Sequence, residues 1–115
     1  MQRRNRLSRS RDFDEVYRRG RSVSTRFLTL LCLTRDETVG APRLGLAVPK
    51  EVGNAVVRNR IKRQLRELFG QRVEQLPATN DYVLKERKGL PEAVEANGFE
   101  WLAERLDEVL GKVAA

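Results

Sequence analysis

Apolar residues recur with a helical period in the middle of this chain, and they predict its longest helix at residues 55–69. Asn54 is a good N-cap for this helix, and Gly70 offers a left-handed C-terminal stop. The apolar positions form one stripe suited to a core, at Val57, Ile61, Leu65 and Leu68. A second helix is expected from Ser10, which can cap it, to Gly20, which ends it.

Strand-like segments and a last helix fill most of the remaining chain. Strands are expected at residues 22–24, from 26 or 27 to 33, at 43–48 and at 81–87, with a turn-rich loop at 35–42. Gly45 suggests a close backbone approach within its strand. Residues 88–98 are expected to be irregular, and residues 99–111 form an amphipathic helix. At 115 residues, the pattern predicts one domain, residues 1–115, of the α/β or α+β class.

The charge is strongly positive and unevenly distributed. The formal net charge is +7 and the pI is near 10.3, which favours a polyanionic partner, either nucleic acid or an anionic membrane surface. Residues 58–66 contain five Arg or Lys and no acid, whereas residues 67–115 contain ten acids and six bases. The positive charge is therefore concentrated in the N-terminal part and in the central helix.

The central helix breaks the local rules of helix electrostatics. Arg58 and Arg60 lie near the positive end of its dipole, where cations destabilise by roughly 0.3–1 kcal/mol each. An anion bound at the helix start would reverse this effect, so a row of phosphates fits better than a merely solvated basic face. The polar face opposite the apolar stripe consists of Asn59, Lys62, Arg63 and Arg66, and Lys50 lies in the turn before the helix.

Residues 1–9 form a basic arm that is expected to be mobile until RNA binds. Its arginines are Arg3, Arg4, Arg6 and Arg9. In the helix that follows, Phe13, Val16 and Tyr17 share one face, and Val16 is expected to be core. Phe13 and Tyr17 are either core residues or the wall of a single-strand groove, where stacking of a base contributes ~1–3 kcal/mol. The pattern does not choose between these two interpretations.

Several function classes are disfavoured by composition. With no His and with Cys32 as the only cysteine, zinc fingers and an internal disulfide are excluded, and the apolar neighbours of Cys32 suggest a buried thiol. The longest apolar run, residues 27–33, is too short to span a membrane, so a cytoplasmic protein is expected. No acid, base and nucleophile form a catalytic constellation. If the protein belongs to an enzyme, a partner must supply the chemistry.

The run GNAVVRNRIKRQLRELF at residues 53–69 resembles the Arg-Asn-Arg signature of the bacterial ribonuclease P protein family. The run RNRLSRSRDF at residues 4–13 and, more weakly, DYVLKERK at 81–88 extend the resemblance. It implies a two-layer α/β sandwich in the order helix, three strands, helix, strand, helix. The sheet would have four strands and an uncommon left-handed crossover through the basic helix, as in a ribosomal protein domain.

The resemblance also implies a function. The family's subunit assists a catalytic RNA that removes the 5′ leader of precursor tRNA, with Mg²⁺ expected to be held by the RNA subunit and the substrate. The implied contacts to the catalytic RNA are Lys50, Asn54, Arg58, Asn59, Arg60, Lys62, Arg63 and Arg66, joined by the arginines of the basic arm. The implied leader cleft contains Phe13, Tyr17 and Leu31, where Leu31 replaces a residue that is often aromatic. Glu51 and the pair Lys85-Glu86 also depart from the family pattern.

Two alternatives belong to other classes. A ribosomal-type RNA-binding protein would need the basic helix, but it would not need Phe13 and Tyr17 exposed on a cleft. A DNA-binding regulator could use residues 55–69 as a recognition helix, but the sequence has no visible turn-helix partner and no dimer seam. The expected partners are therefore the catalytic RNA and precursor tRNA, without a membrane or DNA.

Overall fold

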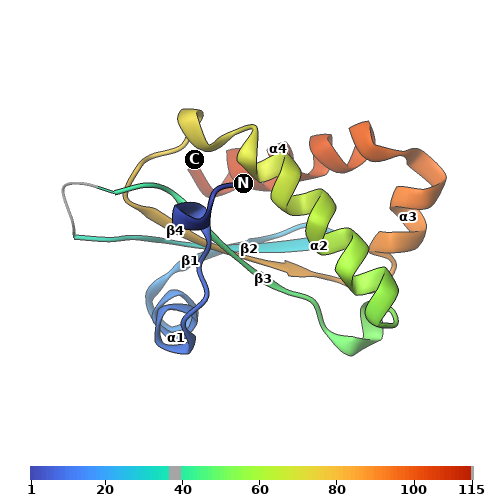
Figure 1. Cartoon of the computed structure of the whole chain (residues 1–115), viewed down its shortest axis with the longest axis horizontal. Coiled ribbons are helices and arrows are strands. Elements are labelled where there is room, and N and C mark those ends of the chain that lie inside the picture. The colour runs from blue at the N-terminus through green and yellow to red at the C-terminus, as the bar shows by residue number, and fades with distance from the viewer. Residues whose placement is uncertain (37–39, 115) are drawn as a thin grey trace.

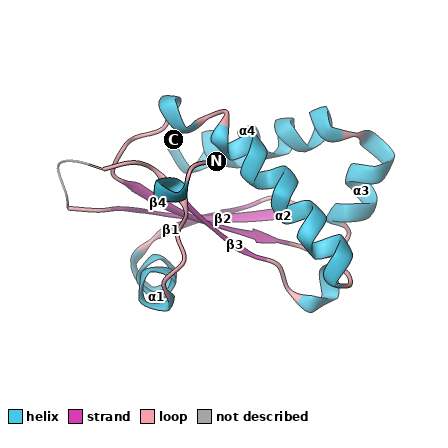
Figure 2. Cartoon of the chain, viewed as in Figure 1, coloured by secondary structure: helices cyan, strands magenta, loops and turns pink. Residues whose placement is uncertain are grey.

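The structure, a computed structural model, describes residues 1–36 and 40–114 and is built on one four-stranded sheet (Figures 1 and 2). The strands are β1 (Arg21–Ser24), β2 (Leu28–Thr34), β3 (Arg43–Ala47) and β4 (Asn80–Glu86), in the spatial order β1-β2-β4-β3. The pairs β1–β2 and β2–β4 are antiparallel, and β3–β4 is parallel. Because β3 and β4 are joined through a helix, they form a βαβ unit.

Helices cover both faces of the sheet. The helices are α1 (Ser10–Arg19), α2 (Ala55–Gly70), α3 (Leu90–Asn97) and α4 (Phe99–Ala114), with short 3₁₀ turns η1 (Arg3–Asn5), η2 (Lys50–Val52) and η3 (Val73–Gln75). Figure 1 shows α1 below the sheet and α2, α3 and α4 above it. The mixed α/β class and the four-stranded sheet are confirmed, but α1 adds a partial third layer to the two that were expected.

The alternation of side chains along β2 and β4 separates two cores. On one face, Leu30 and Leu84 are fully buried in the main core with α2 and α4. On the other face, Leu31 and Val83 form a smaller core with Val16 of α1. Val16 has no exposed surface, as expected. The small core leaves part of this sheet face without a helix over it.

The region after β4 differs most from the expectation. Residues 88–98 were expected to be irregular, yet they contain the eight-residue helix α3. Gly89 and Gly98, which indicated loop, cap the two ends of α3 in positive-φ conformations of 95° and 93°. The prediction that Gly70 is a left-handed stop is wrong, because α2 continues through Gly70 and is followed by Gln71 in the right-handed region.

The remaining boundaries lie within a few residues of the predicted ones. Ser10 is the first helical residue of α1 and not its cap, because Arg9 occupies the cap position. The predicted loop at residues 35–42 includes Glu37, Thr38 and Val39, which lie outside the described residues. Within the described part of the chain, no helix is long and apolar enough to cross a membrane.

Candidate nucleic-acid interface

Helix α2 carries a face of cations that form no ion pair within residues 1–36 and 40–114. The side chain of Asn54 caps the helix by accepting a hydrogen bond from the Val57 backbone N–H at 3.0 Å. The apolar stripe is buried at Ile61, Leu65 and Leu68, which fixes the opposite face toward solvent. Among the described residues, no carboxylate forms an ion pair with the basic side chains of this face: Arg58, Arg60, Lys62, Arg63 and Arg66.

These side chains differ in exposure. Asn59, Arg60 and Arg63 are exposed, as are Lys50 in η2 and Asn54 at the start of the helix. Arg58, Lys62 and Arg66 are partly buried, and the Nε atom of Arg58 has no hydrogen-bond partner in the described part of the chain. Unpaired guanidinium groups repel one another and leave donors unused, so the face is suited to a polyanion.

The N-terminal segment adds its positive charge to the same side of the molecule. Burial lowers the pKa of Arg66, and the nearby charge of Arg6 lowers it further. Met1 lies against Gly70 at the end of α2. Figure 1 shows the N-terminus beside this end of the helix. The two basic regions that the sequence separates by about fifty residues therefore form one continuous surface.

The arm itself is anchored, which corrects the expectation of a mobile segment. Asn5 is 3% exposed, and its side-chain amide donates to the carbonyl of Pro42 at 2.8 Å. Leu7 is buried, and its N–H donates to the carbonyl of Leu44 at 3.0 Å. These contacts hold the backbone while the arginine side chains stay exposed at Arg3, Arg4, Arg6 and Arg9. Local pattern could not reveal them because each partner lies more than thirty residues away.

The predicted cleft residues have three different environments. Tyr17 is 47% exposed on α1. Phe13 is partly buried, and its ring lies so close to Gly45 that a Cβ there would approach its Cζ to 2.4 Å, which confirms the expected close approach. Leu31 is buried in the small core, so it adds an aliphatic side chain beneath the surface beside α1, and its place in the leader cleft stays a prediction.

Beside α1, the uncovered end of the sheet has a hollow that sequence reasoning missed. It has a volume of about 560 Å³ and is lined by Ser24, Arg26, Thr29, Glu51, Lys85, Glu86, Arg87 and Lys88. Its charge is mostly positive because four of these residues are basic. Lys85 and Val83 project to the same face of β4, the face that α1 covers. The alternation of side chains along the strand could have indicated this from the sequence.

Glu86 is the most unusual polar residue of this region. The charged pair Lys85-Glu86 in the sequence predicts a polar end for this strand, but Glu86 is 0% exposed and neither carboxylate oxygen has a hydrogen-bond partner among the described residues. Burial raises its pKa to about 8, although the charges of Lys62 and Arg66 act in the opposite direction. Burial and the charge of Glu86 raise the pKa of Tyr17, so these two groups lie at the same end of the sheet.

Groups for catalysis are sparse in the described residues. No cluster of three or more His, Cys, Asp or Glu in residues 1–36 and 40–114 could hold a metal ion. Cys32 is buried, as expected, and burial raises the pKa of its thiol. A buried protonated thiol is a poor nucleophile. The arrangement is therefore suited to binding an anionic polymer.

Comparison with known proteins agrees with this geometry. The family model described as Ribonuclease P matches residues 1–114. The chain is 41% identical to the ribonuclease P protein component of Acidothermus cellulolyticus, over 94% of this chain and 87% of that protein. It is 39% identical to the corresponding protein of Listeria innocua, over 76% and 73%. The solved structure of the RNase P protein from Thermotoga maritima is 31% identical, covers 96% of this chain and 98% of its own, and gives a TM-score of 0.83.

Proposed function

We propose, because the chain belongs to the ribonuclease P protein family, that it binds both the ribonuclease P RNA and the 5′ leader of precursor tRNA. It is the RNA-binding protein subunit of ribonuclease P, and the ribonuclease P RNA is its partner. The holoenzyme is an endoribonuclease. The observation that carries our assignment of the binding surface is the unpaired cationic face of α2.

The ribonuclease P RNA would bind to α2 and the anchored N-terminal segment. Arg60 and Arg63 are exposed and have no carboxylate partner in the described part of the chain, so their guanidinium forks are available to phosphates. Arg6 extends this surface beside Arg66. Because the segment is held by Asn5 and Leu7, binding would not need to order it, which lowers the entropic cost of association.

The leader would bind on the uncovered part of the sheet beside α1. A single strand needs a cationic groove and an aromatic surface on which bases stack. Tyr17 offers the exposed ring, and the hollow with Lys85, Arg87 and Lys88 offers the charge. Phe13 is partly buried with the tip of its ring against Gly45, so we assign it a smaller share of the stacking surface than Tyr17.

The RNA subunit would carry the chemistry of leader removal. The described residues offer no donor set that fits a resident Mg²⁺ site. We assign the expected Mg²⁺ to the RNA subunit and the substrate, because phosphate oxygens are hard ligands of the kind that Mg²⁺ prefers, and we assign binding and orientation to the protein. We expect this work to take place in the cytoplasm.

A cleavage assay tests this function directly. Precursor tRNA is incubated at low magnesium with the ribonuclease P RNA of the same organism, with and without the protein. We expect efficient cleavage only with protein, reduced by Arg63→Ala and unaffected by the matched control Lys112→Ala on α4, which removes the same charge from an exposed helix far along the chain. Tight RNA binding without any stimulation of cleavage would contradict the proposal and favour a structural RNA-binding protein.

A further inference from the structure

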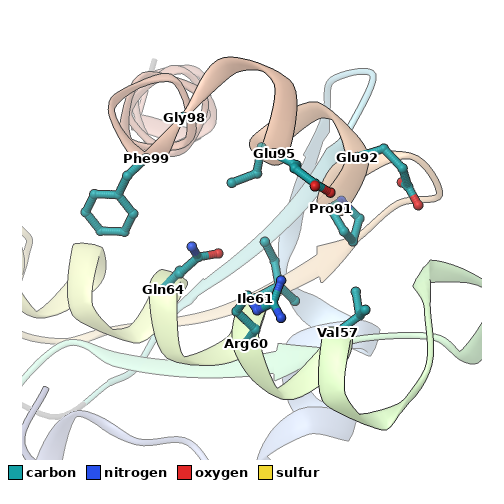
Figure 3. A pocket seen from close by; sticks show the side chains of 10 residues that line it. Val57, Arg60, Ile61, Gln64, Pro91, Glu92, Glu95, Gly98 and Phe99 are labelled. Carbon is teal, nitrogen blue, oxygen red and sulfur yellow. The ribbon is translucent and has the colours of Figure 1, made fainter.

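A pocket between α2 and α3 has the features of a base-binding site. It has a volume of about 390 Å³ and opens beside the basic face of α2. Figure 3 shows Arg60, Ile61 and Gln64 on α2 opposite Glu92 and Glu95 on α3. Its volume is within the range of ~300–1,000 Å³ that is usual for small-ligand sites.

The interior of the pocket is apolar and partly aromatic. Ile61 and Val94 are buried at its base. Phe99, the first residue of α4, is partly buried and presents its ring at one end, as Figure 3 shows. An aromatic ring beside aliphatic side chains is a surface on which a flat heterocycle stacks.

The rim carries opposite charges that do not neutralise each other. Arg60, Glu92 and Glu95 all line the pocket, and in the described residues none of the three forms an ion pair. Two carboxylates beside an RNA-binding helix would repel phosphates. Their oxygens can instead accept hydrogen bonds from the N–H groups of a base, because an ionised carboxylate is an acceptor without a proton to donate.

We propose that this pocket binds an unpaired guanine of the RNA that α2 contacts. Guanine presents two parallel donors, N1–H and the exocyclic amine, which match the two oxygens of one carboxylate, whereas cytosine, adenine and uracil each offer fewer donors there. The amide of Gln64 can donate to guanine O6, and Arg60 pairs with the nucleotide's phosphate. The inference deepens the proposed function and rests on it, since it requires RNA on α2.

Helix α3 exists in this position because of its two glycine caps. The positive φ angles of Gly89 and Gly98 turn the chain sharply on both sides of α3. Gly98 also lines the pocket, next to Phe99. The carboxylates are therefore placed by backbone geometry and not by a flexible loop.

The decisive test asks whether removing the two negative charges strengthens or weakens RNA binding. The double variant Glu92→Gln/Glu95→Gln removes two negative charges and would strengthen RNA binding if those charges only repelled phosphates. We expect instead a weakening of about 5- to 100-fold, the usual range for loss of a two-bond base contact. The matched control is Glu67→Gln/Glu104→Gln, which removes the same charge from exposed positions outside the pocket and should leave binding equal or slightly tighter.

Two binding arms identify the source of the guanine. Affinity is measured for ribonuclease P RNA with the protein, and for precursor tRNA with the assembled holoenzyme. A loss in the first arm supports a guanine of the ribonuclease P RNA, the RNA that we assign to α2, and a loss confined to the second arm overturns that source in favour of precursor tRNA. If the pocket variant equals or exceeds its control in both arms, the guanine site is overturned while the proposed function stands. If the unmodified protein binds neither RNA, the proposed function itself fails.

A nucleotide titration gives an independent readout. NMR spectra of the full chain are recorded with GMP, CMP, AMP and UMP, so that the common phosphate contribution cancels. GMP should bind several-fold more tightly and shift the amide signals of Gln64, Gly98 and Phe99. Equal affinity for all four nucleotides, or shifts confined to the outer face of α2, would contradict base recognition in the pocket.

Discussion

Two buried carboxylates on strand β4, five residues apart, differ in their hydrogen-bond partners. Asp81 is 3% exposed and binds two guanidinium groups: Arg35 donates to it, and Arg43 donates at 2.8 and 2.7 Å. Glu86 is fully buried and its carboxylate has no hydrogen-bond partner in the described chain. The positive charges of Lys62 and Arg66 lower its pKa, although neither side chain donates a hydrogen bond to it.

The difference separates arginines that hold the strands together from arginines that we propose as RNA contacts. At the Asp81 end, Arg35 and Arg43 tie β2, β3 and β4 together, and Arg43 also reaches Asp12 of α1 at 3.6 Å. At the Glu86 end, a protonated carboxyl leaves the positive charge of α2 unneutralised. A carboxylate bonded to Arg66 would compete with RNA phosphates for the same guanidinium, so the lack of pairing agrees with our proposal that α2 binds RNA.

The largest effect is expected from removing the paired acid. Asp81→Ala should destabilise the protein by about 3–5 kcal/mol, because it leaves two guanidinium groups without their buried partner. Denaturant unfolding at neutral pH measures the change. The control is Asp107→Ala, which breaks the ion pair of Arg72 with a carboxylate side chain that is 57% exposed and should cost less than about 1 kcal/mol. Equal losses of unfolding free energy in the two variants would contradict the special structural role of Asp81.

The unpaired acid should make stability depend on pH. The pKa of Glu86 rises from 4.5 to about 8 on folding, so the folded state holds the proton more tightly and is stabilised at low pH. This contribution declines as pH rises through the interval between these two values, by at most about 1.4 kcal/mol per pH unit.

Glu86→Gln tests this dependence because it cannot ionise. We expect the free energy of unfolding of the variant, measured in denaturant at pH 5 and pH 8, to fall less steeply with pH than that of the unmodified protein. Identical pH slopes for the two proteins would show that Glu86 stays ionised in the fold.

Tyr17 tests whether the Glu86 end of the sheet binds a single strand. Tyr17→Ala should weaken holoenzyme binding of precursor tRNA by ~1–3 kcal/mol for each base stacked on the ring. Leaderless tRNA provides the internal control, and its affinity should not change. Phe13→Ala should show the same selectivity but also lower the stability, because its ring packs on Gly45. Equal losses on both RNAs would assign Phe13 to the core alone and would remove Tyr17 from the leader contacts.

The smallest effect on the fold is expected at the exposed cations. Arg63→Ala should change the free energy of unfolding by no more than about 0.5 kcal/mol, because the side chain is exposed and has no ion-pair partner in the described residues. The slope of log affinity for RNA against log salt should decrease by about 0.7–0.9. An unchanged slope would remove Arg63 from the phosphate contacts.

Local patterns were sufficient for the central helix and for most of the sheet. Asn54 has a short side chain at the boundary between extended and helical chain, so its capping role could be predicted before the structure. The apolar stripe at Ile61, Leu65 and Leu68 required only helical periodicity. Helix α3 was missed because Leu90 and Val94 are its only buried positions, too few for a periodic signal, and its glycine caps resemble loop.

Long-range contacts account for the other misses. Burial of Glu86 depends on which helix covers each face of the sheet, and strand alternation alone does not specify that. The anchoring of Asn5 by Pro42 joins segments 37 residues apart. The same limit applies to the pocket between α2 and α3, which required a helix that the sequence pattern did not indicate.

The anchored N-terminal segment has a consequence for solubility. Strand β3 is at the edge of the sheet, and an exposed edge is a template for pairing with another molecule. Arg6 forms a parallel bridge with Leu44, and the N–H of Leu7 occupies the carbonyl of the same residue. Arginine-rich chain thus covers part of the edge and adds charge repulsion there. The segment that we propose as an RNA contact therefore also opposes edge-to-edge aggregation while no RNA is bound.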